Sequence, residues 1–219
     1  MIKMSYLRGN TIPEEPDLLF DKSDSSACHE QVYWGLRTYG PYDKGRPDIR
    51  LAIICPEEEQ KLMAGLIKGL SQGAPVIPGG MPQFFRCKLV VDKEFVTKST
   101  DIEEYEKVAN SVIKSIDYKN LDVVLVHIPR TPRYLTNTPY YRLKAMFTSN
   151  GFPTQMITKY TFQNLNWSYL NLASAIFSKA GGIPWVLASE MKNTDMILGI
   201  SVSNVISHKR RAGGHPRFV

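Results

Sequence analysis

The sequence predicts an α/β fold with a largely parallel sheet flanked by helices. Apolar runs of strand length at 50–55 and 121–128 alternate with segments of helical periodicity. The run LDVVLVHI at 121–128 is apolar almost throughout, as in a strand covered on both faces. Such alternation of strands and helices favours a parallel sheet with helices on its faces. A chain of 219 residues can bury the core that this fold needs.

The first predicted strand and helix adjoin one another. RLAIIC at 50–55 indicates a buried strand, and PEEEQKLMAGLIKGL follows it. Pro56 and three glutamates suit the start of a helix, where the dipole favours negative charge. Leu62, Leu66 and Leu70 recur every four residues and predict its buried face.

The remaining elements follow in alternation, and Gly and Pro predict a loop between the first helix and the second strand. They are a loop at 71–83, a strand at 85–92, a helix at 101–117 with Tyr105, Val108, Val112 and Ile113 on one face, a helix at 138–149, a short strand at 155–158 and a helix at 165–180.

The two ends of the chain differ from this middle part. Residues 1–32 are polar and rich in Pro and acids, which predicts an N-terminal extension with little pairing. After Pro184 the sequence predicts a short strand, a longer strand at 195–207 and a basic turn at 208–217. A strand that begins at 217–219 would leave an unpaired sheet edge. We therefore expect a fragment, or one piece of a two-chain assembly.

Net charge and cysteine content limit the cellular compartment and the classes of partner that we expect. The formal net charge of +6 permits a polyanionic partner without requiring one. Cys28, Cys55 and Cys87 are odd in number and lack metal-ligand spacing, which indicates free thiols. Neither a signal peptide nor an apolar run long enough to span a bilayer is visible. We expect a cytoplasmic protein with no membrane partner.

One constellation carries most of the functional information. Tyr140 and Lys144 lie four residues apart, on one face of the predicted helix at 138–149. Gln155 follows a turn at Asn150–Pro153, and Lys179 precedes Gly-Gly at the end of the next long helix. Two lysines and an amide donor suit a phosphate, since charge-assisted hydrogen bonds are the stronger ones. The tyrosine ring suits stacking on a base.

Each of these residues also has an ordinary structural interpretation. Tyr140 and Lys144 could belong to a solvated helix face, and Lys179 could complement the C-terminal end of a helix dipole. Only the ordered set favours a site. The four histidines have no zinc spacing, and the Gly-Gly pairs form neither a Walker A loop nor a dinucleotide motif.

The ordered set resembles the MID domain of prokaryotic Argonaute proteins, continuing into their PIWI domain. The family pattern is Tyr, Lys four residues later, Gln after a turn, and a second Lys before Gly-Gly-x-Pro-Trp, as in GGIPW at 181–185. GLRTYGPYD at 35–43 resembles the stretch before MID in these proteins, especially the short forms. The resemblance implies a Rossmann-like MID domain at 33–183 and the first strands of an RNase H-like PIWI domain at 184–219. It covers about residues 33–219.

The resemblance also implies what the residues do. In the family, the positions of Tyr140, Lys144, Gln155 and Lys179 bind the 5′-phosphate of a guide strand, and the tyrosine stacks on its first base. Accessory contacts with nucleic acid are predicted at Thr161 and at Lys209, Arg210 and Arg211 of the basic turn.

Two positions depart from the family pattern. The first catalytic Asp of active PIWI domains is replaced by Ser201, and a hydroxyl cannot replace a carboxylate as a ligand of a two-metal site. We therefore assign no catalytic residues and expect no slicing. Some members hold a divalent ion in the pocket through a Gln one turn before the second lysine, a position that is Ala175 here. No metal ligand is assigned, and Mg²⁺ at the guide 5′-phosphate stays an open alternative.

The predicted function is binding of a 5′-phosphorylated guide RNA or DNA, paired with a complementary target, for recognition of foreign nucleic acid without cleavage. A second protein, or the rest of PIWI, would complete the fold. Two alternatives stay open. One is a small-molecule enzyme on a Rossmann-like sheet, which would need reactive groups at the carboxyl ends of the strands. The other is a protein-interaction module with a vestigial pocket.

Overall fold

The central element is a four-stranded parallel sheet. The computed structural model describes residues 16–129, 137–189, 202–203 and 217–218. The sheet strands are β3 (Asp48–Pro56), β6 (Lys88–Thr97), β7 (Val123–Ile128) and β8 (Thr154–Thr158), in the order β6-β3-β7-β8. Every neighbouring pair is parallel. The predicted α/β fold with a largely parallel sheet is confirmed.

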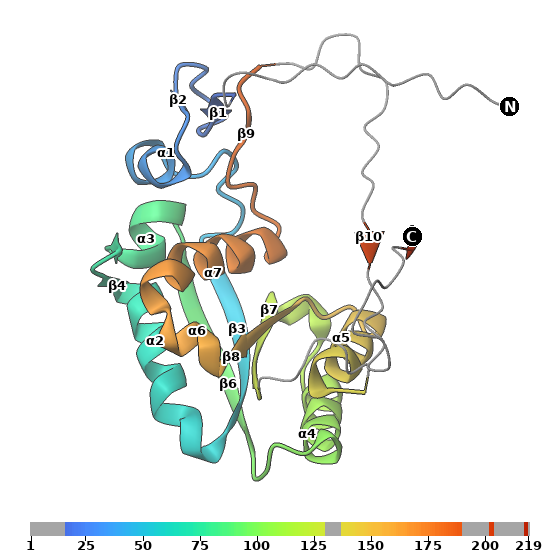
Figure 1. The fold of residues 1–219 in the computed structure, drawn as a ribbon. Helices are drawn as coiled ribbons and strands as arrows, with labels where there is room; N and C mark the ends of the chain where they lie inside the picture. Colours follow the sequence, from blue (N-terminus) through green and yellow to red (C-terminus); the bar gives the residue numbers. More distant parts are fainter. Residues whose placement is uncertain (1–15, 130–136, 190–201, 204–216, 219) are drawn as a thin grey trace, which may run out of the picture.

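Helices cover both faces of this sheet. In Figure 1, α2 (Gln60–Gln72) and α7 (Leu165–Lys179) lie on one side, whereas α4 (Ile102–Ser115) and α5 (Pro139–Ser149) lie on the other. Side chains alternate along β7, so Val123 and Leu125 enter the core under α2 and α7, and Val124 and Val126 enter the core under α4 and α5. All six residues of β7 are buried, as its apolar sequence predicts.

The segment predicted as a loop at 71–83 contains regular structure. A hairpin of β4 (Gly73–Ala74) and β5 (Ile77–Pro78) is followed by α3 (Gly80–Phe85). The second strand therefore begins at Lys88 and not at 85, because Phe84 and Phe85 are buried side chains of α3. Glycine and proline signal a change of direction, but they do not exclude a short helix stabilised by buried aromatic rings.

The first predicted helix begins later than expected and buries a different face. A 3-10 turn, η1 (Glu57–Glu59), precedes α2, so the α-helix begins at Gln60. Met63, Leu66 and Leu70 form its buried face, and Leu62 is 45% exposed. The prediction that Leu62 is buried was wrong. Met63 is as apolar as Leu62, and only the orientation of the helix on the sheet selects between them.

Two short strands pair within residues 16–32, where the sequence predicts an extension with little pairing. β1 (Leu18–Leu19) lies between β2 (Cys28–His29) and β9 (Val186–Leu187), antiparallel to both. Phe20 is fully buried and covers Gly35 of α1 (Val32–Tyr39), where a Cβ would meet its ring at 2.0 Å. The partner of β1 lies more than 160 residues away in sequence, and local patterns carry no signal for such a pairing.

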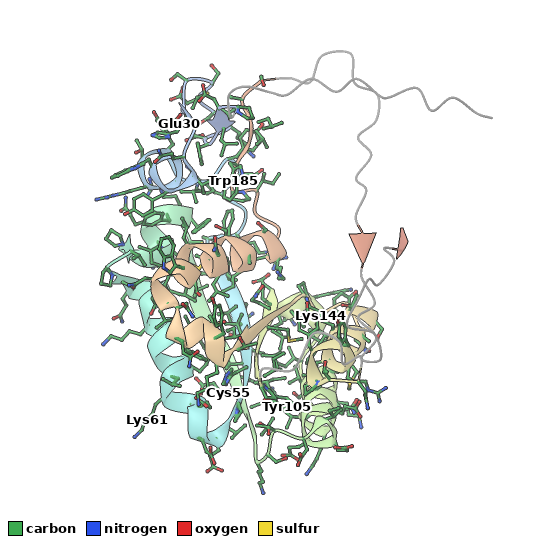
Figure 2. All side chains as sticks on the ribbon, viewed as in Figure 1. Glu30, Cys55, Lys61, Tyr105, Lys144 and Trp185 are labelled. Carbon is green, nitrogen blue, oxygen red and sulfur yellow. The ribbon has the colours of Figure 1, made fainter. Side chains whose placement is uncertain are left out.

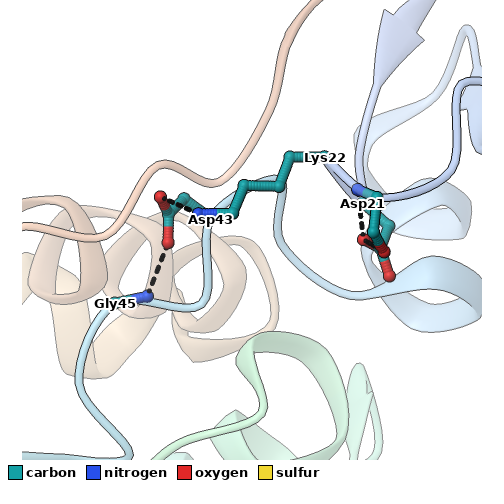
Figure 3. A network of polar contacts seen from close by, with 5 residues as sticks. Asp21, Lys22, Asp43 and Gly45 are labelled. Carbon is teal, nitrogen blue, oxygen red and sulfur yellow. Dashed lines mark hydrogen bonds and ion pairs between the residues drawn. The ribbon is translucent and has the colours of Figure 1, made fainter.

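A polar network joins this N-terminal unit to the loop before β3 (Figure 3). Lys22 Nζ donates to Asp43 Oδ2 at 2.8 Å, and the other carboxylate oxygen accepts from the Gly45 N–H at 3.2 Å. Asp43 also pairs with Ile183 through backbone hydrogen bonds. The loop is thereby held against the chain that leaves α7.

The remaining elements are small. They are η2 (Tyr118–Asn120), α6 (Lys159–Gln163), β10 (Val202–Ser203) and β11 (Arg217–Phe218). β10 and β11 pair antiparallel, with Val202 opposite Phe218. None of the helices in the described part of the chain is both long and apolar enough to cross a membrane.

Candidate functional site

The candidate site lies where β8 begins. A turn at 150–153 ends α5, with Gly151 in the left-handed region at φ +79°. Glycine adopts this conformation without a Cβ penalty, so the chain can reverse directly into β8. Gln155 is the second residue of β8, and its side chain points toward α7, on the same face as the buried Ile157.

Lys144 approaches this point from α5. Its ammonium Nζ donates to the Thr154 carbonyl oxygen at 3.1 Å, and its side chain is half-buried. Tyr140 lies one turn earlier on the same helix and is 40% exposed. Its ring contacts the Tyr141 ring at nearly a right angle, with 5.2 Å between the ring centroids.

Lys179 approaches from the opposite face of the sheet. It is the last residue of α7, and its Nζ donates to Gln155 Oε1 at 2.9 Å. The Gln155 Nε2 donates in turn to the Met156 carbonyl oxygen at 3.0 Å, which fixes the orientation of the amide. Three elements that are separate in sequence thus bring Lys144, Gln155 and Lys179 together.

The two lysines are close enough to affect one another. Partial burial lowers the pKa of Lys179, and the charge of Lys144 lowers it further. Among the described residues, no ion pair includes either lysine. Two cations that lack a carboxylate and lie beside a fixed amide form a site that favours a bound anion.

The helix ends at this site oppose anion binding. Because β7 and β8 are parallel, α5 runs back between them and ends at the amino edge of the sheet, and α7 ends there as well. The C-terminal end of a helix carries partial negative charge, unlike the N-terminal ends that commonly bind phosphate. The attraction for an anion must therefore come from the lysines.

A double-glycine turn positions Lys179 at the end of α7. Gly181 adopts φ +90°, and the N–H of Gly182 donates to the Phe177 carbonyl oxygen at 3.1 Å. A Cβ on Gly182 would meet the Phe177 ring at 2.3 Å. The two glycines therefore have different roles: Gly181 supplies the left-handed turn and Gly182 the close approach.

Thr161 has a structural role in this part of the chain. Its hydroxyl accepts from the Thr158 N–H at 3.3 Å, and the two residues form a capping box at the start of α6. Its predicted contact with nucleic acid stays a prediction. Ser201, Lys209, Arg210 and Arg211 lie outside the described residues.

The position expected to hold a pocket metal offers no ligand. Ala175 lies on α7, one turn before Lys179, and carries only a methyl group. Within the described ranges, no group of three His, Cys, Asp or Glu side chains could hold a metal ion. The described residues thus suggest no protein ligand set for Mg²⁺, although a phosphate could itself bring the ion.

The carboxyl edge of the sheet is where a small-molecule enzyme on this fold would carry its reactive groups. Thr97, Cys55 and His127 lie at or near the carboxyl ends of their strands, and all three are buried. Burial raises the pKa of the Cys55 thiol to about 11 and lowers the pKa of His127. Both groups are therefore neutral at physiological pH, so Cys55 is a poor nucleophile. Figure 2 labels Cys55 near this edge and Lys144 toward the other.

A charge asymmetry in the sequence accompanies the site. Residues 123–189 contain six Lys and Arg residues and no Asp or Glu, so this stretch alone accounts for the net charge of +6. All four residues of the predicted constellation fall within it. The absence of acids over this length could have been recognised in the sequence, and it strengthens the case for a polyanionic ligand.

Two curated proteins resemble the chain in sequence. A Piwi protein from Archaeoglobus fulgidus is 27% identical over 178 residues, which represent 78% of this chain and 37% of that protein. The Argonaute protein of Aquifex aeolicus is 27% identical over 115 residues, or 52% of this chain and 16% of that protein. The chain thus spans about a third or less of the length of these relatives. No protein-family model matches the sequence.

Solved structures share the fold. A crystal structure of Aa-Ago with externally bound siRNA superposes with a TM-score of 0.58 at 19% identity, covering 90% of this chain and 27% of that one. The Argonaute protein from Methanocaldococcus jannaschii superposes with a TM-score of 0.55 at 18% identity, covering 81% of this chain and 27% of that one. The chain is therefore similar in sequence to prokaryotic Piwi and Argonaute proteins, and it shares its fold with Argonaute structures.

Proposed function

We propose that the chain binds the 5′-phosphorylated end of a guide nucleic-acid strand at Lys144, Gln155 and Lys179. The observation that carries the proposal is the convergence of two lysine ammonium groups, unpaired with any described carboxylate, on the start of β8. Lys144 bonds to the Thr154 carbonyl oxygen there, and Lys179 bonds to the side-chain amide of Gln155. A phosphate monoester carries a charge of about −1.5 to −2 at pH 7 and offers three strong acceptor oxygens. It would accept from both ammonium groups in place of the oxygens that hold them in the free protein.

Tyr140 would add a stacking contact to the same nucleotide. Its ring is 40% exposed and lies one helical turn before Lys144. Stacking of a base on an aromatic side chain contributes about 1–3 kcal/mol. The tyrosine would therefore strengthen binding of the terminal nucleotide whether or not it carries a phosphate.

The wider function follows from the same proposal. A cytoplasmic protein that holds a guide could recognise foreign nucleic acid by base pairing between guide and target. With Ser201 at the position of the first catalytic Asp, recognition would proceed without cleavage. The Aa-Ago structure with siRNA supports nucleic acid as the class of partner. A polypeptide that supplies further PIWI elements is a second proposed partner.

Oligonucleotide binding tests the pocket directly. Affinities for one single-stranded oligonucleotide, with either a 5′-phosphate or a 5′-hydroxyl, would be compared in wild-type protein, Lys144→Ala and Lys179→Ala. Each substitution should weaken binding of the 5′-phosphorylated strand by about 10- to 150-fold, since hydrogen bonds to charged groups contribute about 1.5–3 kcal/mol. The 5′-hydroxyl strand should lose far less.

Lys61→Ala provides the matched control. Lys61 is an exposed lysine on α2, labelled in Figure 2 far from Lys144. Its removal lowers the net charge equally without changing the site, so any loss of nonspecific attraction appears there too. Equal losses for the two 5′ ends, or losses in Lys61→Ala that match those of Lys179→Ala, would contradict the pocket assignment.

A further inference from the structure

A second surface feature lies at the other end of α7. A groove of about 470 Å³ is lined by Tyr33, Val76, Asn166, Trp167, Leu170 and Asn171. Trp167 is 82% exposed, the most exposed of the large apolar side chains in the described residues. Asn171 Nδ2 donates to the Trp167 carbonyl oxygen at 3.1 Å. The groove thus presents an open indole ring beside two amide side chains.

A second exposed ring and a cation border the groove. Trp34 is 47% exposed and contacts Tyr33 edge to face at 5.0 Å. The Arg37 guanidinium lies 5.5 Å from the Trp34 ring centroid and donates to the Tyr33 hydroxyl at 3.4 Å. The aromatic surface therefore carries positive charge beside the groove.

The elements around the groove contain no carboxylates. α1, the segment 73–86 and the helices α6 and α7 contain no Asp or Glu, although the chain has 21 acidic residues in total. Glu30, two residues before α1, is the nearest acid in sequence to that helix (Figure 2). A polyanion could therefore approach without charge repulsion, and a polycation would find no complementary charge.

We propose that this groove is a stacking platform for single-stranded nucleic acid, separate from the 5′-phosphate pocket. Exposed aromatic rings, amide donors and a neighbouring arginine are the combination that binds single strands without sequence preference. Trp167 would stack on one base, Asn166 and Asn171 would donate to base edges or phosphates, and Arg37 would attract the backbone. Guide and target strands present the same bases and phosphates, so the occupant is defined by its chemistry as a single strand of nucleic acid.

The platform lies within reach of the pocket but is distinct from it. Trp167 and Lys179 are 12 residues apart on α7, which corresponds to about 18 Å along the helix axis. They also project about 120° apart around that axis, so one phosphate cannot contact both. The platform and the 5′-phosphate pocket can therefore succeed or fail independently in a binding experiment.

A second copy of the chain fits the groove less well. It would bring the same basic, acid-free surface, and like charges would repel across the contact. A single strand brings phosphates that neutralise Arg37 together with bases that cover the indole ring. The charge pattern thus favours the nucleic-acid occupant.

The test uses a 5′-hydroxyl oligothymidylate of about 12 nucleotides, labelled at its 3′ end and followed by fluorescence anisotropy. Trp167→Ala should weaken binding about 5- to 150-fold, the loss of one stacked base. Trp167→Phe should retain most of the affinity, because a smaller ring still stacks. Tyr118→Ala removes a ring that is 50% exposed and does not line the groove, and it should bind as wild type does.

Three results would overturn the proposal. The first is that Trp167→Ala binds the oligonucleotide as tightly as the wild type does. The second is that Tyr118→Ala loses as much oligonucleotide affinity as Trp167→Ala. The third is that sedimentation shows a dimer that Trp167→Ala disrupts, while oligonucleotide affinity is unchanged. That result would identify the groove as an interface between copies of the chain. The phosphate pocket is assessed separately, since Lys179→Ala affects the 5′-phosphorylated strand whereas Trp167→Ala affects both strands equally.

Discussion

Lys179→Met should increase the stability of the free protein while it weakens guide binding. The Lys179 side chain is partly buried, and its pKa is lowered by desolvation and by the charge of Lys144. A lowered lysine pKa means that the folded state disfavours the charged form. Methionine has a similar length and fills the same apolar space without a charge.

The expected gain is about 1 kcal/mol in the free energy of unfolding at pH 7. Replacing a partly buried charge by an apolar side chain relieves its desolvation and the repulsion from Lys144. The hydrogen bond from the Lys179 ammonium to Gln155 Oε1 is lost as well. Both side chains are partly exposed, so solvent screening reduces its contribution below the about 1.5–3 kcal/mol typical of charged groups, and its loss offsets only part of that relief. Gln155 is half-buried, so water can replace the lost donor.

Chemical denaturation in urea would measure the difference, and pH supplies an internal check. Below the lowered folded-state pKa of Lys179, both states bind the proton and the full destabilisation is present. As pH rises from that value toward the ordinary value of 10.5, the folded state loses its proton first and the destabilisation disappears. The advantage of Lys179→Met should therefore be larger at pH 7 than near pH 10.5, where it should shrink.

Lys61→Met serves as the control, because an exposed lysine should change the unfolding free energy by no more than about 0.5 kcal/mol. The reasoning is refuted if Lys179→Met is less stable than wild type, or if its advantage over Lys61→Met is absent at pH 7. Either outcome would mean that the interaction with Gln155 outweighs burial and charge repulsion.

Two further predictions concern the packing beside the site and the buried histidine. Gly182→Ala should weaken binding of 5′-phosphorylated strands by displacing the end of α7, because the new Cβ meets the Phe177 ring at 2.3 Å. Gly65→Ala, whose Cβ meets no atom within 4 Å, should leave affinity unchanged and stabilise the protein by about 0.5–1 kcal/mol, as oligonucleotide titration and urea denaturation would show. His127 has its pKa lowered by burial, so the unfolded state binds its proton more readily and stability should fall as pH drops below about 6.5. Denaturation of His127→Gln between pH 7.5 and 5 should show a smaller loss, and an identical loss in both proteins would contradict this account.

Several helices and strands were predictable from the sequence because their signals are local. The apolar run of β7, the helical periodicity of α4 and the turn before β8 depend on neighbours within a few residues. The short helix α3 was missed, since its stability comes from Phe84 and Phe85 packing in the core. The burial of Met63 in place of Leu62 has the same origin.

By itself, the sequence determined the parallel α/β architecture, the order of the constellation from Tyr140 to Lys179 and the acid-free charge of residues 123–189. Only the tertiary structure decided that Lys144 and Lys179 reach the start of β8 from opposite faces of the sheet, that β1 pairs with β9, and that Trp167 borders a groove. The physical reason is distance along the chain. Periodicity and turn chemistry act over a few residues, whereas these contacts depend on how whole elements pack against one another.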